Sequence, residues 1–337
     1  MIDNVKIKLS RFNKDLAGNP NLEFHGKSYS SEVYRLYNHE GKEKGIYLLL
    51  KYNPQKQVLK IENSIRKWFL GGFSLLDLTK KTANKAFEKI AKILGITEEE
   101  FCKATFTQCE IGLNIRTRIP VENIVPMVVR YSTFKRYQFD YGTVGFNGED
   151  LSLIMYDKCD ELLEHNKKYD KSAKRKAFNA LSKRNYNFFR IEFNMFDKQS
   201  FINKDLSHIK TIGDILENYL ELYSFWTKEI SRIVLLNKLV LSKEMTPKQY
   251  IIARVLEIDG FTSFERNCLK RAKPNISSRI INEAIEVIHS FSNPIRYNTN
   301  KFKLDILKNL KRINNKEKEL DIKRLSGNLF YSEDNIN

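Results

Sequence analysis

Apolar and polar residues alternate in three segments of the chain, 107–117, 151–156 and 188–195. Successive side chains of a β-strand point to opposite faces of its sheet, so this period of two predicts strands with one apolar and one polar face. If the three strands share one antiparallel sheet, their polar residues converge on its exposed face. These residues are Glu110, Asn114, Tyr156, Lys158, Arg190 and Glu192.

Local signals predict further strands and helices before residue 200. Two short, partly β-branched runs at 45–51 and 57–63, separated by a turn-forming stretch, predict a hairpin. Residues 79–94 have the apolar spacing of an amphipathic helix that Gly95 ends. A second short helix is expected after Thr97, which begins a capping box. The remaining expected elements are strands at 134–140 and 142–147 and helical segments within 158–184.

Beyond about residue 205 the patterns are helical, at 211–240, 247–258, 262–272 and 276–291. Thr246 is a plausible N-cap for the second of these segments, with Pro247 at the first helical position and Gln249 at the third. The predicted fold class is α+β, an antiparallel-sheet domain with flanking helices followed by an all-helical C-terminal domain. The predicted boundaries are 1–205 for the sheet domain, 206–325 for the helical domain and 326–337 for a disordered tail.

Composition narrows the function classes. The 337 residues include 58 Lys and Arg against 41 Asp and Glu, a net charge of +17, and 42% are hydrophobic, enough for a sizeable core. This charge favours a polyanionic partner, nucleic acid first and an anionic membrane second. No apolar run is long enough to span a membrane, the N-terminus lacks a signal-peptide pattern, and the four cysteines lack zinc-site spacing. We therefore expect an intracellular protein without a membrane partner.

Carboxylates on the predicted polar face favour a metal site. Glutamate is disfavoured in mid-strand, yet Glu110 and Glu192 each lie in the middle of one. The alternative is a solvated sheet surface. That alternative explains a mid-strand glutamate in one strand better than it explains the same feature in two strands. The carboxylates, with the amide of Asn114, offer hard oxygen ligands for Mg²⁺ or Mn²⁺. Tyr156 beside such an ion is a candidate nucleophile, and Asp157 either caps the next helix or is a further metal ligand.

Four motifs resemble those of phage and plasmid replication initiators, the filamentous-phage gene II/X type and the related Rep_trans family of rolling-circle plasmids. The segment 61–72, with the Leu-Thr pair that follows at 78–79, is similar to the family's GSLxKxxxGxN…LT segment. Residues 106–114 resemble its RxDxAxD strand, 152–161 its SxxxxYDKxxE motif and 190–192 its RxE strand. The chain departs from the family where Glu110 replaces an Asp, Asn114 replaces an acid and Asn63 replaces a Gly.

The resemblance implies a site-specific enzyme that nicks and joins origin DNA, double- and single-stranded, in the cytoplasm of a bacterial host. The family's tyrosine attacks a phosphodiester at the origin, stays linked to the 5′-phosphate and frees a 3′-hydroxyl that primes replication. Carried over, the nucleophile is Tyr156, while Lys158 and Arg190 contact or neutralise the scissile phosphate. The implied metal ligands are Glu110, Glu192, Asp157 and Asn114. The helical domain would serve origin recognition, contacts in a homodimer or recruitment of a host helicase.

Other basic residues are candidates for contacts to DNA phosphates. The runs 158–184 and 301–324 each hold nine Lys or Arg against four acids, although such a run is also typical of a solvated helix face. Helical segments at 262–271 and 275–291 could form a helix-turn-helix reader. The candidate DNA contacts are Lys67, Lys174, Arg175, Lys176, Lys183 and Arg184.

Two alternatives stay open. Tyr137 and Tyr141 have the spacing that some two-tyrosine nickases use, so Tyr137 is a reserve nucleophile. Cross-strand aromatic packing in a hairpin that turns near residue 141 is the other explanation for this pair. The alternative function is a non-catalytic DNA-binding protein, a replication regulator or repressor, which would bind DNA without a metal ion.

Overall fold

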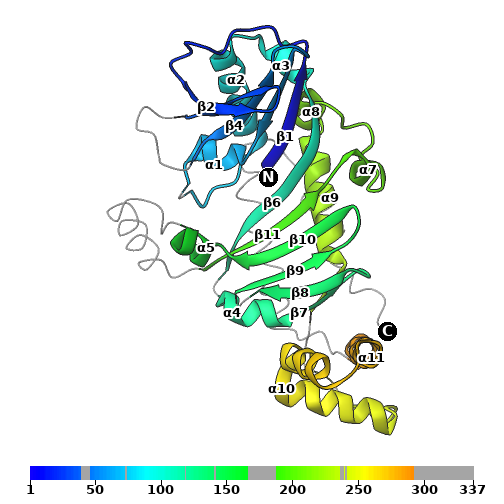
Figure 1. The fold of residues 1–337 in the computed structure, drawn as a ribbon. Helices are drawn as coiled ribbons and strands as arrows, with labels where there is room; N and C mark the ends of the chain where they lie inside the picture. The colour runs from blue at the N-terminus through cyan, green and yellow to red at the C-terminus, as the bar shows by residue number, and fades with distance from the viewer. Residues whose placement is uncertain are drawn as a thin grey trace.

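The computed structural model describes residues 1–38, 46–72, 74–117, 119–139, 142–165, 187–235, 239 and 241–291. Its centre is a ten-stranded antiparallel sheet in the order β2-β3-β4-β5-β1-β6-β11-β10-β9-β8 (Figure 1). A second sheet pairs β7 (Val128–Tyr131) with β12 (Ile233–Leu235). The strands of the large sheet are β1 (Ile2–Ser10), β2 (Leu22–Ser28), β3 (Ser31–Leu36), β4 (Leu48–Asn53), β5 (Val58–Glu62), β6 (Thr105–Thr117), β8 (Lys135–Phe139), β9 (Thr143–Asn147), β10 (Leu151–Asp157) and β11 (Asn187–Met195).

Helices flank this sheet and follow it, so the predicted α+β class is confirmed. Those before β11 are α1 (Ile65–Leu70), α2 (Lys80–Leu94), α3 (Glu98–Cys102), α4 (Val121–Ile124), the 3₁₀ turn η1 (Val125–Met127) and α5 (Lys158–His165). Those after it are α7 (Lys198–Ile202), α8 (Ile212–Glu217), α9 (Tyr219–Ser231), α10 (Pro247–Arg271) and α11 (Pro274–Phe291). The rest of the predicted helical run 158–184 and everything after residue 291, including the predicted tail, lie outside the described residues.

The helix ends form where the local sequence predicts them. Thr97 caps α3 in a capping box with Glu100, and Thr246 caps α10 in a box with Gln249. Gly95 follows α2 in the left-handed conformation, with φ 68°, and its N–H bonds the last turn. Because these signals act within one helical turn, they are independent of the tertiary fold.

The apolar face of the sheet packs under helices in one hydrophobic core. Fully buried residues include Ile61 of β5, Leu113 of β6 and Phe193 of β11, and α2 covers them together with α8 and α9. Trp226 of α9 belongs to this core, so the packing continues past the predicted domain boundary at residue 205.

A second, smaller core lies between α10 and α11, beyond the β8 side of the sheet (Figure 1). It contains Leu256 and Phe261 of α10 and Ile288 of α11, with Val129 of β7 reaching it from the first part of the chain. None of the helices in the described part of the chain combines the length and apolarity that crossing a bilayer requires.

One expected helix differs from the fold. The predicted helix 211–240 breaks at Asn218, ends at Ser231 and gives way to β12, a β-branched run that pairs with β7. The predicted helical segments 247–258 and 262–272 are both present, as the two halves of α10 on either side of the non-helical residue Gly260. The patterns above also do not predict β2 and β3, which lie at one edge of the large sheet, or β1, which lies between β5 and β6.

The kink of α10 depends on Gly260, whose backbone adopts φ 71° and ψ 162°. Only glycine enters this region without strain, so Gly260→Ala should lower the free energy of unfolding by about 1–3 kcal/mol. Urea denaturation followed by circular dichroism measures the change. Ser263→Ala, an exposed change in the same helix, is the control and should be neutral. A Gly260→Ala protein as stable as the wild type would contradict the prediction.

Candidate functional site

The three strands with alternating polarity lie next to one another in the sheet. β11 pairs with β6 on one side and with β10 on the other. Opposite residues on adjacent strands share a face, so Arg190 stands between Asn114 and Tyr156, and Glu192 between Gly112 and Ile154. The polar positions of the three predicted strands therefore gather at the middle of the sheet.

Three carboxylates meet on this face. Asp3 of β1, Glu110 of β6 and Glu192 of β11 each place an oxygen within 4.8 Å of the other two. Gly112 provides the space for them, because a Cβ there would lie 2.8 Å from Cγ of Glu192 and 2.9 Å from Nη2 of Arg190. A glycine in mid-strand weakens a sheet, and here it lets two long side chains cross the neighbouring strand.

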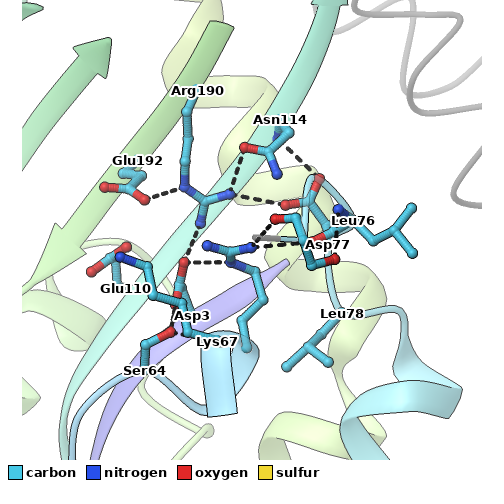
Figure 2. Close-up of polar contacts among 12 residues, drawn as sticks. Asp3, Ser64, Lys67, Leu76, Asp77, Leu78, Glu110, Asn114, Arg190 and Glu192 are labelled. Atoms are coloured by element: carbon cyan, nitrogen blue, oxygen red, sulfur yellow. Dashed lines mark hydrogen bonds and ion pairs between the residues drawn. The ribbon is translucent and has the colours of Figure 1, made fainter. Parts of the chain in front are cut away.

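Arg190 is the centre of the polar network (Figure 2). It is fully buried, and its Nη2 donates to Asp3 at 2.6 Å while its Nη1 donates to Asp77 and to Oδ1 of Asn114, both at 3.0 Å. Its Nε donates to Glu192. Every guanidinium nitrogen is therefore used inside the protein. In this structure Arg190 positions the carboxylates. That Arg190 contacts or neutralises the scissile phosphate stays a prediction.

A second arginine shares the same acceptors. Arg66 of α1 is also fully buried, and its Nε donates to Asp3 at 2.7 Å. The hydroxyl of Ser64, the N-cap of α1, donates to the other oxygen of Asp3. Asn114 uses its amide to donate to the carbonyl of Leu75 at 3.0 Å. Protein groups bind both ends of the Asn114 amide. The side chain that we expected to be a metal ligand therefore holds the loop and Arg190 in place.

Negative charge exceeds positive charge at the site. When all four are ionised, Asp3, Asp77, Glu110 and Glu192 surround two guanidinium groups, those of Arg66 and Arg190, which leaves two negative charges over. Burial and the neighbouring carboxylates Glu192 and Asp3 raise the pKa of Glu110 well above its ordinary value. Burial also opposes ionisation of Glu192, but Arg190, a hydrogen bond with Glu110 and the charge of Lys158 together outweigh it and lower the pKa of Glu192.

This donor set fits a divalent cation. Hard ions such as Mg²⁺ and Mn²⁺ prefer carboxylate oxygens, and Asp3, Glu110 and Glu192 supply three of them around an uncompensated charge. Asp3 and Glu192 already bind arginines, whereas no cation of the described residues forms an ion pair with Glu110, so the fit rests chiefly on Glu110. The surroundings of Glu110 raise its pKa and so favour its neutral form, whereas a bound cation would favour the ionised carboxylate.

Tyr156 lies at the edge of the carboxylate group. Its hydroxyl donates to Oε1 of Glu192 at 3.0 Å, and Nζ of Lys158 lies 5.5 Å from its ring centre. Burial, followed by the charge of Glu192, raises the pKa of the phenol well above its ordinary value. The hydroxyl is therefore protonated at neutral pH and is held in place by a carboxylate that can take its proton.

Lys158 and Lys67 form a small cationic group beside Tyr156. Both bind the carboxylate of Glu161, Lys158 at 2.5 Å and Lys67 at 2.9 Å. Burial, with Arg66 and Arg190 nearby, lowers the pKa of Lys158 to about 8. Burial also opposes ionisation of Glu161, but the two lysines outweigh it and lower its pKa to about 2. The group carries one net positive charge and leaves the whole site negative.

The other predicted residues are placed as follows. Asp157 caps α5, since its Oδ1 accepts from the N–H groups of Cys159 at 2.7 Å and Asp160 at 3.1 Å, and it stands apart from the three-carboxylate group. Tyr137 lies across Gly145, where a Cβ would be 2.2 Å from its Cζ, and β9 and β10 separate its strand from Glu192. The candidate DNA contacts Lys174, Arg175, Lys176, Lys183 and Arg184, and the reserve partner Tyr141, lie outside the described residues.

Sequence reasoning missed Asp3, Arg66 and Asp77. Asp3 precedes an alternating Val-Lys-Ile-Lys-Leu run, which is a strand signal that could have found β1. Arg66 adjoins Lys67 in a motif already singled out. Asp77 lies in the loop before α2, and nothing local to it indicates that it reaches Arg190 across the sheet.

No protein-family model matches the sequence, and no curated protein matches it. Among solved structures, the rolling circle replication initiator protein from Geobacillus stearothermophilus matches with a TM-score of 0.39 and 8% sequence identity, over 73% of this chain and 89% of that one. We therefore interpret the carboxylate group from its geometry alone.

The raised pKa of Glu110 predicts a measurable stability effect. The folded state holds the Glu110 proton more tightly than the unfolded state, so the wild-type protein loses stability as pH rises above about 4.5, the ordinary value. Glu110→Gln removes this loss, and without metal at pH 7.5 it should raise the free energy of unfolding by about 1–3 kcal/mol. Thermal unfolding across pH, with the exposed Glu149→Gln as control, measures it.

Added Mn²⁺ should raise the melting temperature of the wild-type protein but not that of Glu110→Gln, because the variant lacks one ligand and the uncompensated charge. A Glu110→Gln protein that is less stable than the wild type in the absence of metal would show that Glu110 has a different role.

Proposed function

We propose that this chain is a metal-dependent DNA nicking and joining enzyme that initiates rolling-circle replication. One observation carries the proposal: the Tyr156 hydroxyl lies 3.0 Å from Glu192, a member of the group that Asp3 and Glu110 complete. A tyrosine held against carboxylates that fit a divalent cation is the arrangement that phosphoryl transfer to a protein hydroxyl requires. The four motifs of the initiator family support the same conclusion.

Each residue then has a distinct task. Mg²⁺ or Mn²⁺, held by Asp3, Glu110 and Glu192, would neutralise charge on the scissile phosphate and favour ionisation of the nearby phenol. Oη of Tyr156 forms a bond to phosphorus while the bond from phosphorus to the 3′-oxygen breaks. The phenol proton passes to Glu192, and the 3′-oxygen takes a proton from water. Lys158 and Lys67 lie where they can offset the charge of the phosphate once Glu161 yields to it.

The reverse reaction joins the strand. A phosphotyrosine conserves the energy of the phosphodiester, so attack by a 3′-hydroxyl on it reseals the DNA and restores Tyr156 without ATP. This cycle suits a replication initiator, which must open an origin to give a primer and close the product at the end of a round. The substrate is therefore origin DNA, nicked as a duplex and rejoined as a single strand, in the cytoplasm of a bacterial host.

The helices after the sheet domain are assigned to accessory tasks. The second half of α10 and α11, which share one hydrophobic core, form a helix pair whose proposed use is origin recognition. Contact with a second copy of the chain and recruitment of a host helicase are the other uses. A non-catalytic DNA-binding protein is the alternative for the whole chain, and it would bind DNA equally well after Glu110→Ala or Glu192→Ala.

Tyr156→Phe tests the nucleophile. The full chain, supplied with Mn²⁺ and a supercoiled plasmid carrying the replicon that encodes it, should nick the plasmid and remain covalently attached after denaturation in detergent. Tyr156→Phe should lose the attachment and lower the nicking rate by more than about 10³-fold, because the attacking oxygen is gone. Tyr137→Phe, which removes the reserve hydroxyl, should behave as the wild type.

Attachment that persists in Tyr156→Phe and disappears in Tyr137→Phe would move the nucleophile to Tyr137. Sequence-specific binding by the wild-type chain without any nicking, unchanged in Glu110→Ala and Glu192→Ala, would favour the non-catalytic alternative.

A further inference from the structure

Three lysines stand in a row across adjacent strands of the large sheet. Lys8 of β1 lies directly opposite Lys60 of β5, and Lys60 lies directly opposite Lys51 of β4. Directly opposite residues of antiparallel strands point to the same face, and neighbouring strands are about 4.8 Å apart. The three side chains therefore leave one face of the sheet within about 10 Å of one another. We call Lys8, Lys60 and Lys51 the lysine row.

The lysine row belongs to the polar face that carries the carboxylates. The residues adjacent to the row along each strand, Leu9, Leu59 and Tyr52, are buried in the core on the opposite face. Lys60 is exposed, as is Lys6 two residues before Lys8, while Lys8 and Lys51 are half-buried. Solvent, and so a ligand, reaches all four.

The lysine row lowers the stability of the folded protein, and the contacts of these lysines do not fully offset this loss. Like charges directly opposite one another on a sheet repel. Lys51 has a partner, Glu62, at 2.7 Å, but none of the carboxylates in the described part of the chain pairs with Lys6, Lys8 or Lys60. Threonine or glutamate at position 60 would serve a purely structural strand better. The row is best explained by an anion that the folded protein binds.

The row continues in two directions. At the end of β1 a hollow of about 320 Å³ is lined by Lys8 together with Arg11, Lys14 and Lys103, with Glu100 as its one acid. In the other direction, Lys6 pairs with Gln108 of β6, whose amide donates at 2.9 Å to Asn194, the residue opposite Glu110. A continuous polar path therefore connects the hollow and the lysine row with the carboxylate group.

We propose that the lysine row and the basic hollow bind the phosphodiester backbone of the DNA strand that runs to Tyr156. The proposal rests on the nicking function and specifies where its substrate lies. Asp3 and Lys8 are five residues apart on one strand, so about 15 Å of sheet separates the carboxylates from the row, a span of about four or five nucleotides. Ammonium groups that neutralise phosphates carry no sequence information, so this surface would hold DNA of any sequence and leave the choice of origin to another part of the chain.

Binding of a labelled oligonucleotide, measured by fluorescence anisotropy over a range of salt concentrations, tests this surface. The full chain is used without metal, so that no cleavage is needed. The double variant Lys8→Gln/Lys60→Gln should lower the slope of log affinity against log salt by about 1.4 for single-stranded DNA or about 1.8 for duplex DNA. The loss should be the same for two unrelated sequences. Lys85→Gln, an exposed lysine of α2 on the other side of the sheet, is the control and should leave the slope unchanged.

A second readout separates binding from structure. Lys60→Gln removes the middle charge of the row, so it should raise the melting temperature by about 1–3 °C while it weakens DNA binding. A residue needed only for folding would not show these opposite effects. An unchanged salt slope in the double variant, or a lowered melting temperature with unchanged affinity, would overturn the proposal.

The test does not depend on the chemistry at Tyr156. If the double variant loses affinity but the wild-type chain never nicks DNA, the surface stands and the nicking function fails. If the wild-type chain nicks DNA and the double variant binds with the wild-type slope, the nicking function stands and the surface is refuted. Loss of binding to phosphatidylglycerol vesicles without any loss of binding to DNA would also refute it.

Discussion

Arg190 donates hydrogen bonds to Asp3, Asp77 and Glu192, so one buried guanidinium joins carboxylates from β1, the loop before α2 and β11. Burying an ion costs several kcal/mol unless oppositely charged partners compensate it. Arg190 and the three carboxylates can therefore be buried only together. The compensation is incomplete on the negative side, because Glu110 adds a carboxylate without adding a cation. The stability of the middle of the sheet and its capacity to attract a metal ion therefore have a common origin in this network.

The charges behind the net charge of +17 are distributed unevenly over the sheet. Cations in excess lie on the polar face of β1, β5 and β4 and around the hollow at the end of β1, whereas uncompensated anions gather at β6 and β11. A basic surface attracts DNA from a distance, and this attraction depends only weakly on the DNA sequence. An acidic centre repels phosphate until a cation binds there. Under the proposed function, affinity for DNA and the ability to cut it therefore belong to different residues of one sheet.

Structural features that depend on residues close together in the sequence could be predicted. Alternation identified β6, β10 and β11 and their polar face, and capping signals placed the ends of α2, α3 and α10. Features that depend on distant partners were not predictable in this way. Asn114 resembles a metal ligand in its motif, but the loop at 75–77 occupies its backbone and its amide. Arg190 resembles a phosphate contact in its motif, and nothing near it in the sequence indicates that Asp3 and Asp77 accept its hydrogen bonds. Propensity and pattern carry no information about which side chains a sheet of this order brings together.

Asp3 and Arg190 are 187 residues apart along the chain, and they meet only because β11 inserts between β6 and β10. At the usual rate of translation, about 10–40 s pass between synthesis of the two residues. During that interval Asp3 can pair with Arg66, which emerges early, but the carboxylate group lacks Glu192 and the loop lacks its anchor. Under the proposed function, the order in which the ribosome releases the strands keeps a growing chain free of a complete metal site, and nicking would begin only when the sheet is whole.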